Sequence, residues 1–336
     1  MKRLLVSLAF TLLLLIVSPA HAISENALHE GFHSIILPFY ESGEKGTIIG
    51  QEGALLSYRI FPAEHEIGSI VISSGRTESH AKYAELMLDL HLAGYSVFIV
   101  DHRGQGFSSR LLADPEISYV EQFENYVLDL KSFVETVVKP RHPTKLYILA
   151  HSMGGAIASM YVERYPDDFR ALAMSSPMLQ VDTGKYPETI AYLLSKTSCQ
   201  LGAARKYAVG QKGYSSVPYK NNVLTHSYAR YQALTFENEA MHPEIHMGGA
   251  SYRWVQHAIE ATHQIYQDAA RVQIPVLLFQ AGRDQIVKPN GQTLFCERAL
   301  HCIRVRLPES NHEVFMEVDA IREPVLKKTL QFFSQN

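Results

Sequence analysis

The chain has 336 residues, of which 46% are hydrophobic and 19% are charged, and its formal net charge is −3. A chain of this length and composition can bury a full core as one large domain, with room for an inserted subdomain. Its slight negative charge offers no electrostatic attraction to a polyanion, so we expect no nucleic-acid partner.

The first 22 residues have the pattern of a secretory signal peptide. Two basic residues precede an apolar run over residues 4–17, and Ala20 and Ala22 form the small-x-small pattern that signal peptidase cleaves. Cleavage before Ile23 would remove both positive charges and shift the formal charge from −3 to −5. We therefore predict a periplasmic or secreted protein. The alternative is an uncleaved segment anchored in the inner membrane, which the short apolar run disfavours.

The chain that follows alternates between predicted strands and helices. Residues 23 to about 66 alternate weakly and contain several glycines, which predicts initial antiparallel strands, the clearest at 55–61. Later strands are predicted at 69–73, 97–100, 146–149, 171–175, 276–280 and 303–307. Helices are predicted at 80–92, 120–138, from 154 to before Pro166, 252–267, 290–299 and 324–333. Continuous apolar strands separated by helices predict an α/β fold, with a mostly parallel central sheet flanked by helices.

This alternation stops between residues 177 and about 250. Tyrosine, lysine, asparagine and histidine become frequent there, glycines interrupt the segment, and residues 190–194 and 228–236 have helical character. We therefore expect a core formed by residues 23–176 and 251–336, with an inserted helical cap at 177–250.

The residues around Ser152 predict a nucleophile elbow. The apolar strand at 146–149 leads into Ala150-His151-Ser152-Met153-Gly154, and a helix follows, so the Ser152 hydroxyl would be held in a strained, exposed turn. Small residues must flank the serine. Gly154 fits the usual Gly-x-Ser-x-Gly pattern, and Ala150 departs from it by one methyl group. An ordinary Ser-Gly turn before a helix is the alternative interpretation.

A serine nucleophile needs a base, and an acid that orients the base, in the chain order Ser, Asp or Glu, His. Asp284 comes just after the strand at 276–280, and His312 comes just after the strand at 303–307. The carboxyl ends of such strands form the ligand crevice of an α/β sheet. We predict Ser152, Asp284 and His312 as a catalytic triad. The alternatives are a turn or helix-capping role for Asp284 and a loop position without function for His312.

The tetrahedral intermediate of acyl transfer needs two backbone N–H donors. We predict that Met153, directly after the nucleophile, supplies one, and that Arg76, in the loop after the strand at 69–73, supplies the other. His151 is predicted to be structural. Asp101 and Arg103 are predicted to order the loop that they occupy.

The spacing of histidines and cysteines predicts no metal site. His242 and His246, for example, lack the glutamate of a His-Glu-x-x-His helix. Cys296 falls late in a predicted helix and Cys302 at the start of the next strand, so the turn between them can bring their Cα atoms within roughly 4.4 to 6.8 Å. In an oxidising compartment we predict a disulfide between them, which leaves Cys199 unpaired. Two reduced, buried cysteines are the alternative.

Several segments resemble the family of monoacylglycerol lipases and bacterial lysophospholipases of the L-two type, a branch of the α/β-hydrolases. They are Gly75-Arg76-Thr77-Glu78-Ser79, Asp101-His102-Arg103-Gly104-Gln105-Gly106, residues 110–115, Ala150-His151-Ser152-Met153-Gly154-Gly155, residues 222–227 and residues 252–255. The resemblance covers most of the chain from about residue 50. It implies an α/β-hydrolase fold, the same triad, a helical cap over an acyl-chain pocket, and no cofactor. One departure is Ser74, which stands where monoacylglycerol lipases have the histidine of a His-Gly pair.

Together these features predict a carboxylic ester hydrolase acting on lipids with a single acyl chain, a lysophospholipid or a monoacylglycerol, through an acyl-Ser152 intermediate. The alternatives are a general short-chain carboxylesterase and a non-catalytic lipid carrier. We expect a lipid substrate as partner, with transient contact to a membrane surface and no obligate protein partner. Tyrosine and phenylalanine side chains of the cap are expected to line part of the acyl pocket, because a lipid tail needs an apolar cavity.

Overall fold

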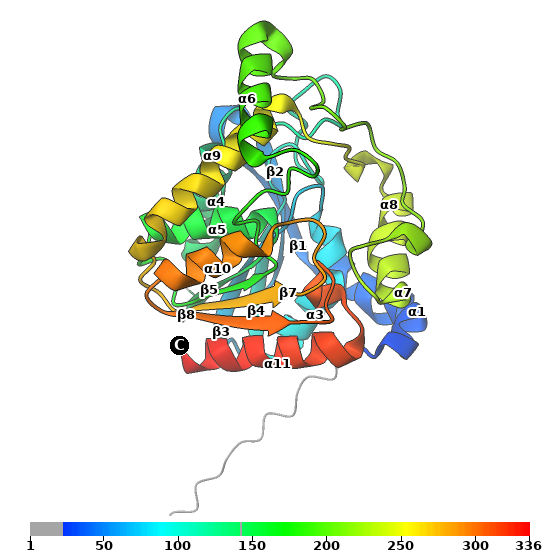
Figure 1. Ribbon diagram of the computed structural model, residues 1–336. Coiled ribbons are helices and arrows are strands. Elements are labelled where there is room, and N and C mark those ends of the chain that lie inside the picture. Colours follow the sequence, from blue (N-terminus) through cyan, green and yellow to red (C-terminus); the bar gives the residue numbers. More distant parts are fainter. Residues whose placement is uncertain (1–22, 142) are drawn as a thin grey trace, which may run out of the picture.

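The computed structural model describes residues 23–141 and 143–336 (Figure 1). The predicted signal peptide, residues 1–22, lies outside the described residues. Within the described part, no helix is both long enough and apolar enough to cross a membrane.

An eight-stranded sheet forms the centre of the molecule, in the order β1-β2-β4-β3-β5-β6-β7-β8. β2 pairs antiparallel with both β1 and β4, whereas all the other neighbours are parallel. The strands are β1 (Glu44–Ile49), β2 (Leu55–Phe61), β3 (Gly68–Ser73), β4 (Tyr95–Val100), β5 (Leu146–His151), β6 (Leu172–Ser175), β7 (Val276–Ala281) and β8 (Cys302–Leu307). The mostly parallel sheet confirms the predicted fold class.

Strands β3, β4, β5 and β7 bury every one of their residues. They do so because helices cover both faces of the sheet (Figure 1). This two-sided burial is the physical reason that these strands are continuous apolar runs in the sequence.

The helices form one apolar core on each face of the sheet. The first core includes residues from α4 (Glu124–Phe133), α5 (Met153–Arg164), α9 (Tyr252–Asp268) and α10 (Pro289–Arg298). The second includes residues from α1 (Leu28–Gly31), α2 (Leu37–Ser42), α3 (Ala84–Leu92) and α11 (Asp319–Gln335). α11 begins five residues earlier than predicted and contains Pro324 in its first turns.

The prediction of strands from residue 23 onward is wrong for its first part, because residues 25–42 are helical. α1 and α2 are joined by a π-helical turn, and one face of this segment packs into the second core. Buried residues recur every four positions along that face: Leu28, Phe32, Ile36 and Tyr40. This spacing is the signature of an amphipathic helix, and it was the signal that the glycine-based interpretation overlooked.

The inserted segment at residues 177–250, which we call the cap, contributes no strand to the sheet in its described residues. Its helices are α6 (Glu188–Ser198), α7 (Tyr228–Arg230) and α8 (Asn238–Met241), and a π-helical turn links α7 to α8. Both predicted helices of the cap are therefore present, but residues 204–218 between them are irregular. α6 packs against α9 and projects from the end of the molecule where α9 begins (Figure 1).

Two buried arginines tie the cap and the C-terminal helix to the core. Arg230, in α7, donates to the carboxylates of Glu85 (3.0 Å) and Asp319 (2.7 Å). Arg322, in α11, donates to the Asp89 carboxylate. Both arginines are fully buried. Removal of one partner would leave a buried charge unpaired, at a cost of about 3–5 kcal/mol. The pairs of Arg230 therefore hold this side of the cap in place, and the pair of Arg322 holds α11 against α3.

Cys296 in α10 and Cys302 at the start of β8 are joined by a disulfide, with their Cα atoms 5.1 Å apart. Cys199 in the cap is a free cysteine. This is the pairing that the sequence predicts.

We predict that replacing both Cys296 and Cys302 by serine lowers the free energy of unfolding by at most about 2–3 kcal/mol, because the disulfide closes a short loop. Denaturant unfolding of the native and double-variant proteins measures this difference. Mass spectrometry of the unreduced protein should show the two cysteine peptides linked and Cys199 as a thiol. A peptide linked through Cys199 would contradict the pairing.

Candidate active site

Ser152 lies in the sharp turn between β5 and α5, and its backbone is strained. Its φ of 51° and ψ of −120° lie in a region that non-glycine residues rarely adopt, at a cost of about 1–3 kcal/mol. Three hydrogen bonds hold this conformation. The Ser152 N–H donates to the Ser175 carbonyl (3.1 Å), and the Ser152 carbonyl accepts from the N–H groups of Gly155 (2.9 Å) and Met178 (2.8 Å). The turn therefore presents the hydroxyl in one fixed direction.

The elbow needs small residues because α5 approaches β3 very closely. A Cβ atom on Gly154 would lie 2.1 Å from the carbonyl oxygen of Ser73 and 2.5 Å from that of Ser74. No side chain can fit there. Ala150, which replaces the usual first glycine of the pattern, is fully buried, so the sheet accommodates its methyl group.

The structure brings together the three predicted triad residues. The Ser152 Oγ lies 3.0 Å from Nε2 of His312, and Nδ1 of His312 lies 2.8 Å from Oδ2 of Asp284. The other carboxylate oxygen of Asp284 accepts the N–H groups of Ile286 (2.8 Å) and Val287 (3.1 Å). Asp284 thus closes the turn after β7 and also orients the histidine.

The charge of Asp284 fits this orienting role. Burial alone would raise its pKa, but the hydrogen bond and charge of His312, together with the two backbone N–H donors, lower the pKa below the ordinary value. The ionised carboxylate accepts a hydrogen bond from the N–H at Nδ1, so we assign the free lone pair of His312 to Nε2, which faces the Ser152 hydroxyl. Nε2 of His312 can therefore accept the hydroxyl proton of Ser152 when the serine oxygen attacks a carbonyl carbon.

Arg76 and Met153, the predicted backbone donors, both line the pocket that contains Ser152. Met153 is the first residue of α5, where a backbone N–H has no acceptor within the helix. The loop at residues 75–78 is held by the side-chain amide of Gln105, which donates to the carbonyls of Gly75 (2.7 Å) and Glu78 (3.0 Å). Gln105 is buried, and sequence reasoning did not single it out.

Asp101 and Arg103 hold the loop that they occupy through hydrogen bonds to residues outside the triad. The Asp101 carboxylate accepts the N–H groups of His80 (2.6 Å) and Phe107 (2.7 Å). The Arg103 guanidinium makes two hydrogen bonds to the carboxylate of Asp129, at 2.6 and 2.8 Å. Both side chains are buried, so the structure places them in the supporting role that the sequence predicts.

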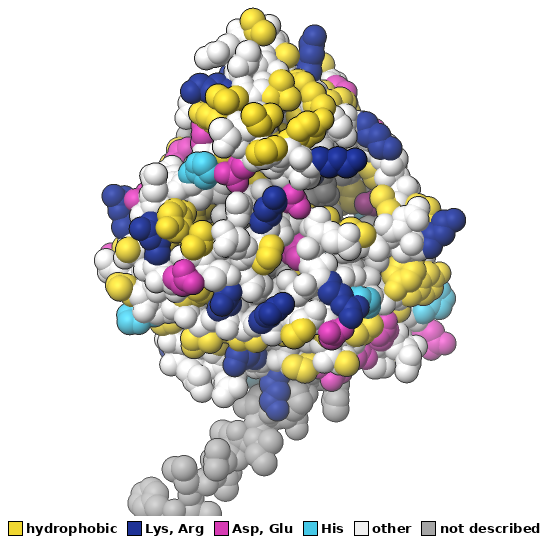
Figure 2. Space-filling view, viewed as in Figure 1, with side chains coloured by type: hydrophobic (Ala, Val, Ile, Leu, Met, Phe, Trp, Pro, Cys, Tyr) yellow, Lys and Arg dark blue, Asp and Glu magenta, His cyan; other side chains and the backbone are white. Residues whose placement is uncertain are grey.

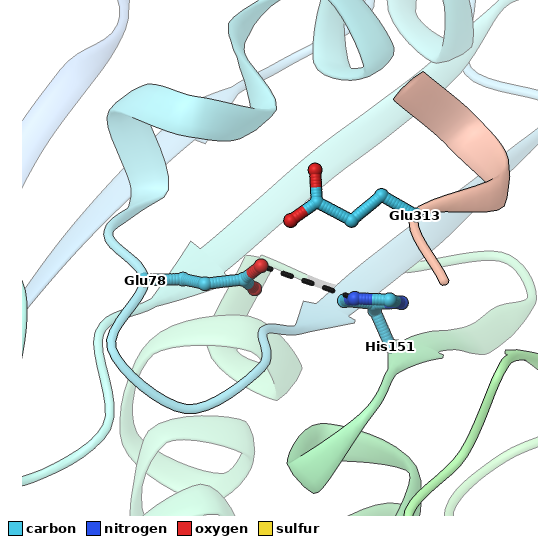
Figure 3. A group of neighbouring side chains, drawn as sticks. All are labelled: Glu78, His151 and Glu313. Atoms are coloured by element: carbon cyan, nitrogen blue, oxygen red, sulfur yellow. Dashed lines mark ion pairs between the residues drawn. The ribbon is translucent and has the colours of Figure 1, made fainter. Parts of the chain in front are cut away.

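A buried charged cluster lies beside the triad (Figure 3). Glu78, His151 and Glu313 converge so that one ligand atom from each lies within 4.8 Å of the others, a geometry that could hold a metal ion. However, the Lys82 ammonium donates to Glu78 (2.7 Å) and to Glu313. Lys82 therefore occupies the position between the two carboxylates, while burial and the charge of Glu78 raise the pKa of Glu313.

His151 and Glu78 both lack a proton in this cluster, so the imidazole is neutral and the carboxylate is charged. Burial lowers the pKa of His151 to about 3, so its ring is neutral at physiological pH. Its Nδ1 lies 3.0 Å from the Ser175 hydroxyl, and its ring centroid lies 4.8 Å from that of His312. Burial would raise the pKa of Glu78, but the nearby Lys82 charge holds that pKa below its usual range. The neutral ring of His151 thus packs against the ring of His312.

Glu317, which sequence reasoning missed, binds the cap to the loop that carries His312. Its buried carboxylate accepts the backbone N–H of Asn311 (2.7 Å), and both the N–H (3.1 Å) and Nδ1 (2.9 Å) of His226 in the cap. Next to it, the Glu313 N–H donates to the carbonyl of Leu224 (2.9 Å). These bonds flank His312 on both sides, so the cap and the triad histidine share one hydrogen-bonded seam.

The triad opens into a pocket of about 600 Å³. Its wall is mainly apolar and combines core and cap residues, among them Met178, Val181, Ile190, Leu194, Leu234, Ile245, Met247 and Trp254. A cavity of this size and lining suits a ligand with a substantial apolar part. Tyr186 is an aromatic side chain of the cap in this wall, but most of the cap's contribution is aliphatic rather than the tyrosine and phenylalanine expected.

Comparisons with known proteins point to one group of hydrolases. Residues 64–319 match the sequence profile of a family described as serine aminopeptidase, S33. Lysophospholipase L2 of Escherichia coli K12 is 35% identical over 93% of this chain and 94% of its own length. The monoacylglycerol lipase of Mycolicibacterium smegmatis is 26% identical over 81% of this chain and 90% of its own.

The fold also has close structural neighbours. A soluble variant of monoglyceride lipase from Saccharomyces cerevisiae, solved in complex with a substrate analog, has a TM-score of 0.68 and 21% sequence identity. The match covers 87% of this chain and 96% of the yeast chain. At this level of identity the likeness supports the fold.

We predict that Glu317→Gln lowers kcat by roughly 10- to 100-fold with little change in KM, because a misplaced His312 weakens proton transfer but leaves the acyl pocket intact. Steady-state kinetics on a soluble ester measures both constants. Glu323→Gln is the matched control, since Glu323 is exposed on α11. An unchanged kcat in a folded Glu317→Gln protein would show that the seam does not position the histidine.

Proposed function

This chain belongs to the α/β-hydrolase family of lysophospholipase L2 and the monoacylglycerol lipases, and we propose that it hydrolyses the carboxylic ester of single-acyl-chain lipids. Lysophospholipids and monoacylglycerols are the two substrate classes. The observation that carries this proposal is the hydrogen-bonded series Ser152, His312 and Asp284, which opens into an apolar pocket of about 600 Å³.

The geometry supports a double-displacement reaction. The Ser152 oxygen attacks the ester carbonyl carbon while Nε2 of His312 takes its proton, and the Asp284 carboxylate stabilises the imidazolium that forms. The N–H groups of Arg76 and Met153 donate to the carbonyl oxygen as it becomes an oxyanion. The intermediate then collapses, the ester C–O bond breaks, and His312 protonates the departing alcohol, which is glycerol or the glycerophospho head group.

Water completes the cycle. His312 removes a proton from a water molecule, whose oxygen attacks the carbonyl carbon of acyl-Ser152. The second tetrahedral intermediate releases the fatty acid, and the Ser152 oxygen regains its proton from His312. Every proton moves through Nε2 of one histidine, so this sequence requires no cofactor.

The size of the pocket favours substrates with a long acyl chain over substrates with a short one. The aliphatic wall from the cap and the core extends well beyond the volume needed for an acetyl or butyryl group, and each buried methylene contributes about 0.8 kcal/mol. A short-chain carboxylesterase is the alternative reading of the same triad. A non-catalytic lipid carrier is less well supported, because the triad groups lie within hydrogen-bonding distance of each other.

We further propose that the protein is exported to the periplasm or secreted after cleavage between Ala22 and Ile23. The signal-like residues 1–22 and the Cys296–Cys302 disulfide support this location, since disulfides persist in oxidising compartments. Cell fractionation with N-terminal sequencing tests it. A mature N-terminus at Met1 in the inner-membrane fraction would favour the anchored alternative.

We predict that Ser152→Ala lowers kcat on lysophospholipid and monoacylglycerol by at least about 10⁴-fold, because it removes the nucleophile. Fatty-acid release from both lipid classes measures this. An acyl-length series of soluble esters separates the alternatives, since a short-chain esterase would show its highest kcat/KM on acetyl or butyryl esters.

Ser159→Ala is the matched control for this substitution. Ser159 is a buried serine in α5 whose hydroxyl donates to the Gly155 carbonyl, and it does not line the pocket. We expect it to retain activity within a few-fold. Ester hydrolysis that survives in Ser152→Ala would sink the proposed mechanism.

A further inference from the structure

Arg76 lines the substrate pocket, and its side chain is fixed at one end. Its Nη1 donates to the Ser118 hydroxyl (3.0 Å) and to the Gly248 carbonyl (3.4 Å). Its guanidinium carbon lies 5.1 Å from the ring centroid of Trp254, which also lines the pocket. A cation that rests on an aromatic ring and is bound through one nitrogen has a defined orientation. The guanidinium is therefore positioned before any ligand arrives.

The other edge of this guanidinium has no acceptor among the described residues. Nε and Nη2 of Arg76 make no hydrogen bond there, and both atoms remain accessible to solvent. These two nitrogens form the edge through which arginine binds a carboxylate or a phosphate by two parallel hydrogen bonds. In Arg103 the same edge donates to both carboxylate oxygens of Asp129. In Arg76 this edge is available to a ligand.

The charge of Arg76 is also unpaired within the described part of the chain. Arg76 and Lys82 are the two lysine or arginine residues that line the pocket, and Lys82 forms ion pairs with Glu78 and Glu313. Burial lowers the pKa of Arg76 from its ordinary value, and Tyr126, rather than a carboxylate, opposes this effect. Arginine nevertheless stays charged. A partly buried cation without a counter-charge is stabilised when a ligand brings an anion to it.

We propose that the Nε–Nη2 edge of Arg76 binds the phosphate of a lysophospholipid head group. The backbone N–H of Arg76 is the predicted donor to the ester carbonyl oxygen, so one residue would hold both the reacting ester and the phosphate. In a lysophospholipid acylated on its terminal glycerol oxygen, as many bonds separate the carbonyl carbon from the phosphorus as separate the backbone nitrogen of Arg76 from its guanidinium carbon. The two spacings therefore match.

This inference rests on the proposed function and adds a preference between its two substrate classes. The phosphate of a lysophospholipid is charged at physiological pH, whereas a monoacylglycerol has a neutral hydroxyl group in its place. The ion pair with Arg76 therefore strengthens the binding of the first class alone. Figure 2 shows the surface hollowed beneath the hydrophobic side chains over α6, and Ile190 and Leu194 of α6 line the pocket. The outer part of a head group can thus remain in water.

The first test compares lysophosphatidylcholine with a monoacylglycerol of the same acyl chain, both in the same detergent micelles. The ratio of their kcat/KM values should fall roughly 10- to 100-fold in Arg76→Gln, because two charge-assisted hydrogen bonds to the phosphate are lost. Arg76→Lys should restore part of the ratio, since lysine keeps the charge but not the two-pronged geometry. The ratio cancels any change at the oxyanion, which both substrates share.

Arg253→Gln is the matched control. Arg253 lies in the first turn of α9, forms an ion pair with Glu121 (3.2 Å), and is not among the residues that line the pocket. Its substitution should leave the ratio unchanged. Equal losses on both lipids in Arg76→Gln would overturn the phosphate assignment and leave the hydrolase proposal intact, since they would show that the side chain only supports the loop around the oxyanion.

The second test needs no lipid substrate. Glycerol 3-phosphate should inhibit the hydrolysis of a soluble short-chain ester at least roughly tenfold more strongly than glycerol does, and Arg76→Gln should abolish this difference. Equally strong inhibition by inorganic phosphate would overturn the head-group assignment in favour of a general anion site. Inhibition by glycerol 3-phosphate that persists in Arg76→Gln would also overturn it. If neither lipid is hydrolysed but the Arg76-dependent inhibition is present, the proposed function fails and the phosphate site stands.

Discussion

The backbone of Ser152 has a positive φ that a serine adopts only under constraint, and the surroundings of that one residue set the architecture of the site. The strain persists because the serine's own N–H and carbonyl are bound by β6, α5 and the chain after β6. α5 must then start within contact of β3, which excludes any side chain at Gly154. This geometry places the Ser152 hydroxyl beyond the end of β5. The loops that carry Asp284 and His312 lie at the same edge of the sheet.

Buried charge holds the rest of the site in register with this elbow. Lys82 donates to both Glu78 and Glu313 on one side of His312, and Glu317 accepts backbone N–H groups on the other. In the cap, Arg230 has the same role, because its ion pairs with Glu85 and Asp319 fix its position. Such pairs contribute little net stability compared with apolar packing, yet breaking any one of them is expensive. Their effect is therefore to specify one arrangement of cap, loop and triad.

The cap combines a fixed side with a side that faces outward. Around Arg230 it is tied to α3 and α11 by ion pairs with Glu85 and Asp319, and to Glu317 by hydrogen bonds. Around α6 it packs on α9 but leaves large aliphatic side chains in solvent. One side of the cap is thus bonded to the residues that follow His312, while the other leaves apolar side chains exposed.

The sequence by itself determined those features that depend on local pattern. Buried strands appear as apolar runs, the elbow needs small residues around Ser152, and Asp284 and His312 follow strand ends in a set order, so the fold and the triad positions could be predicted. The short separation of Cys296 and Cys302 made their pairing predictable in the same way. The N-terminal helices were missed, although Leu28, Phe32, Ile36 and Tyr40 carried the local signal. The tertiary structure alone decided the groups that support the triad: Gln105, Lys82 and Glu317 act on partners up to 231 residues away. A buried glutamate or lysine looks like a surface residue in a sequence, because its burial depends on a counter-charge that only folding brings near.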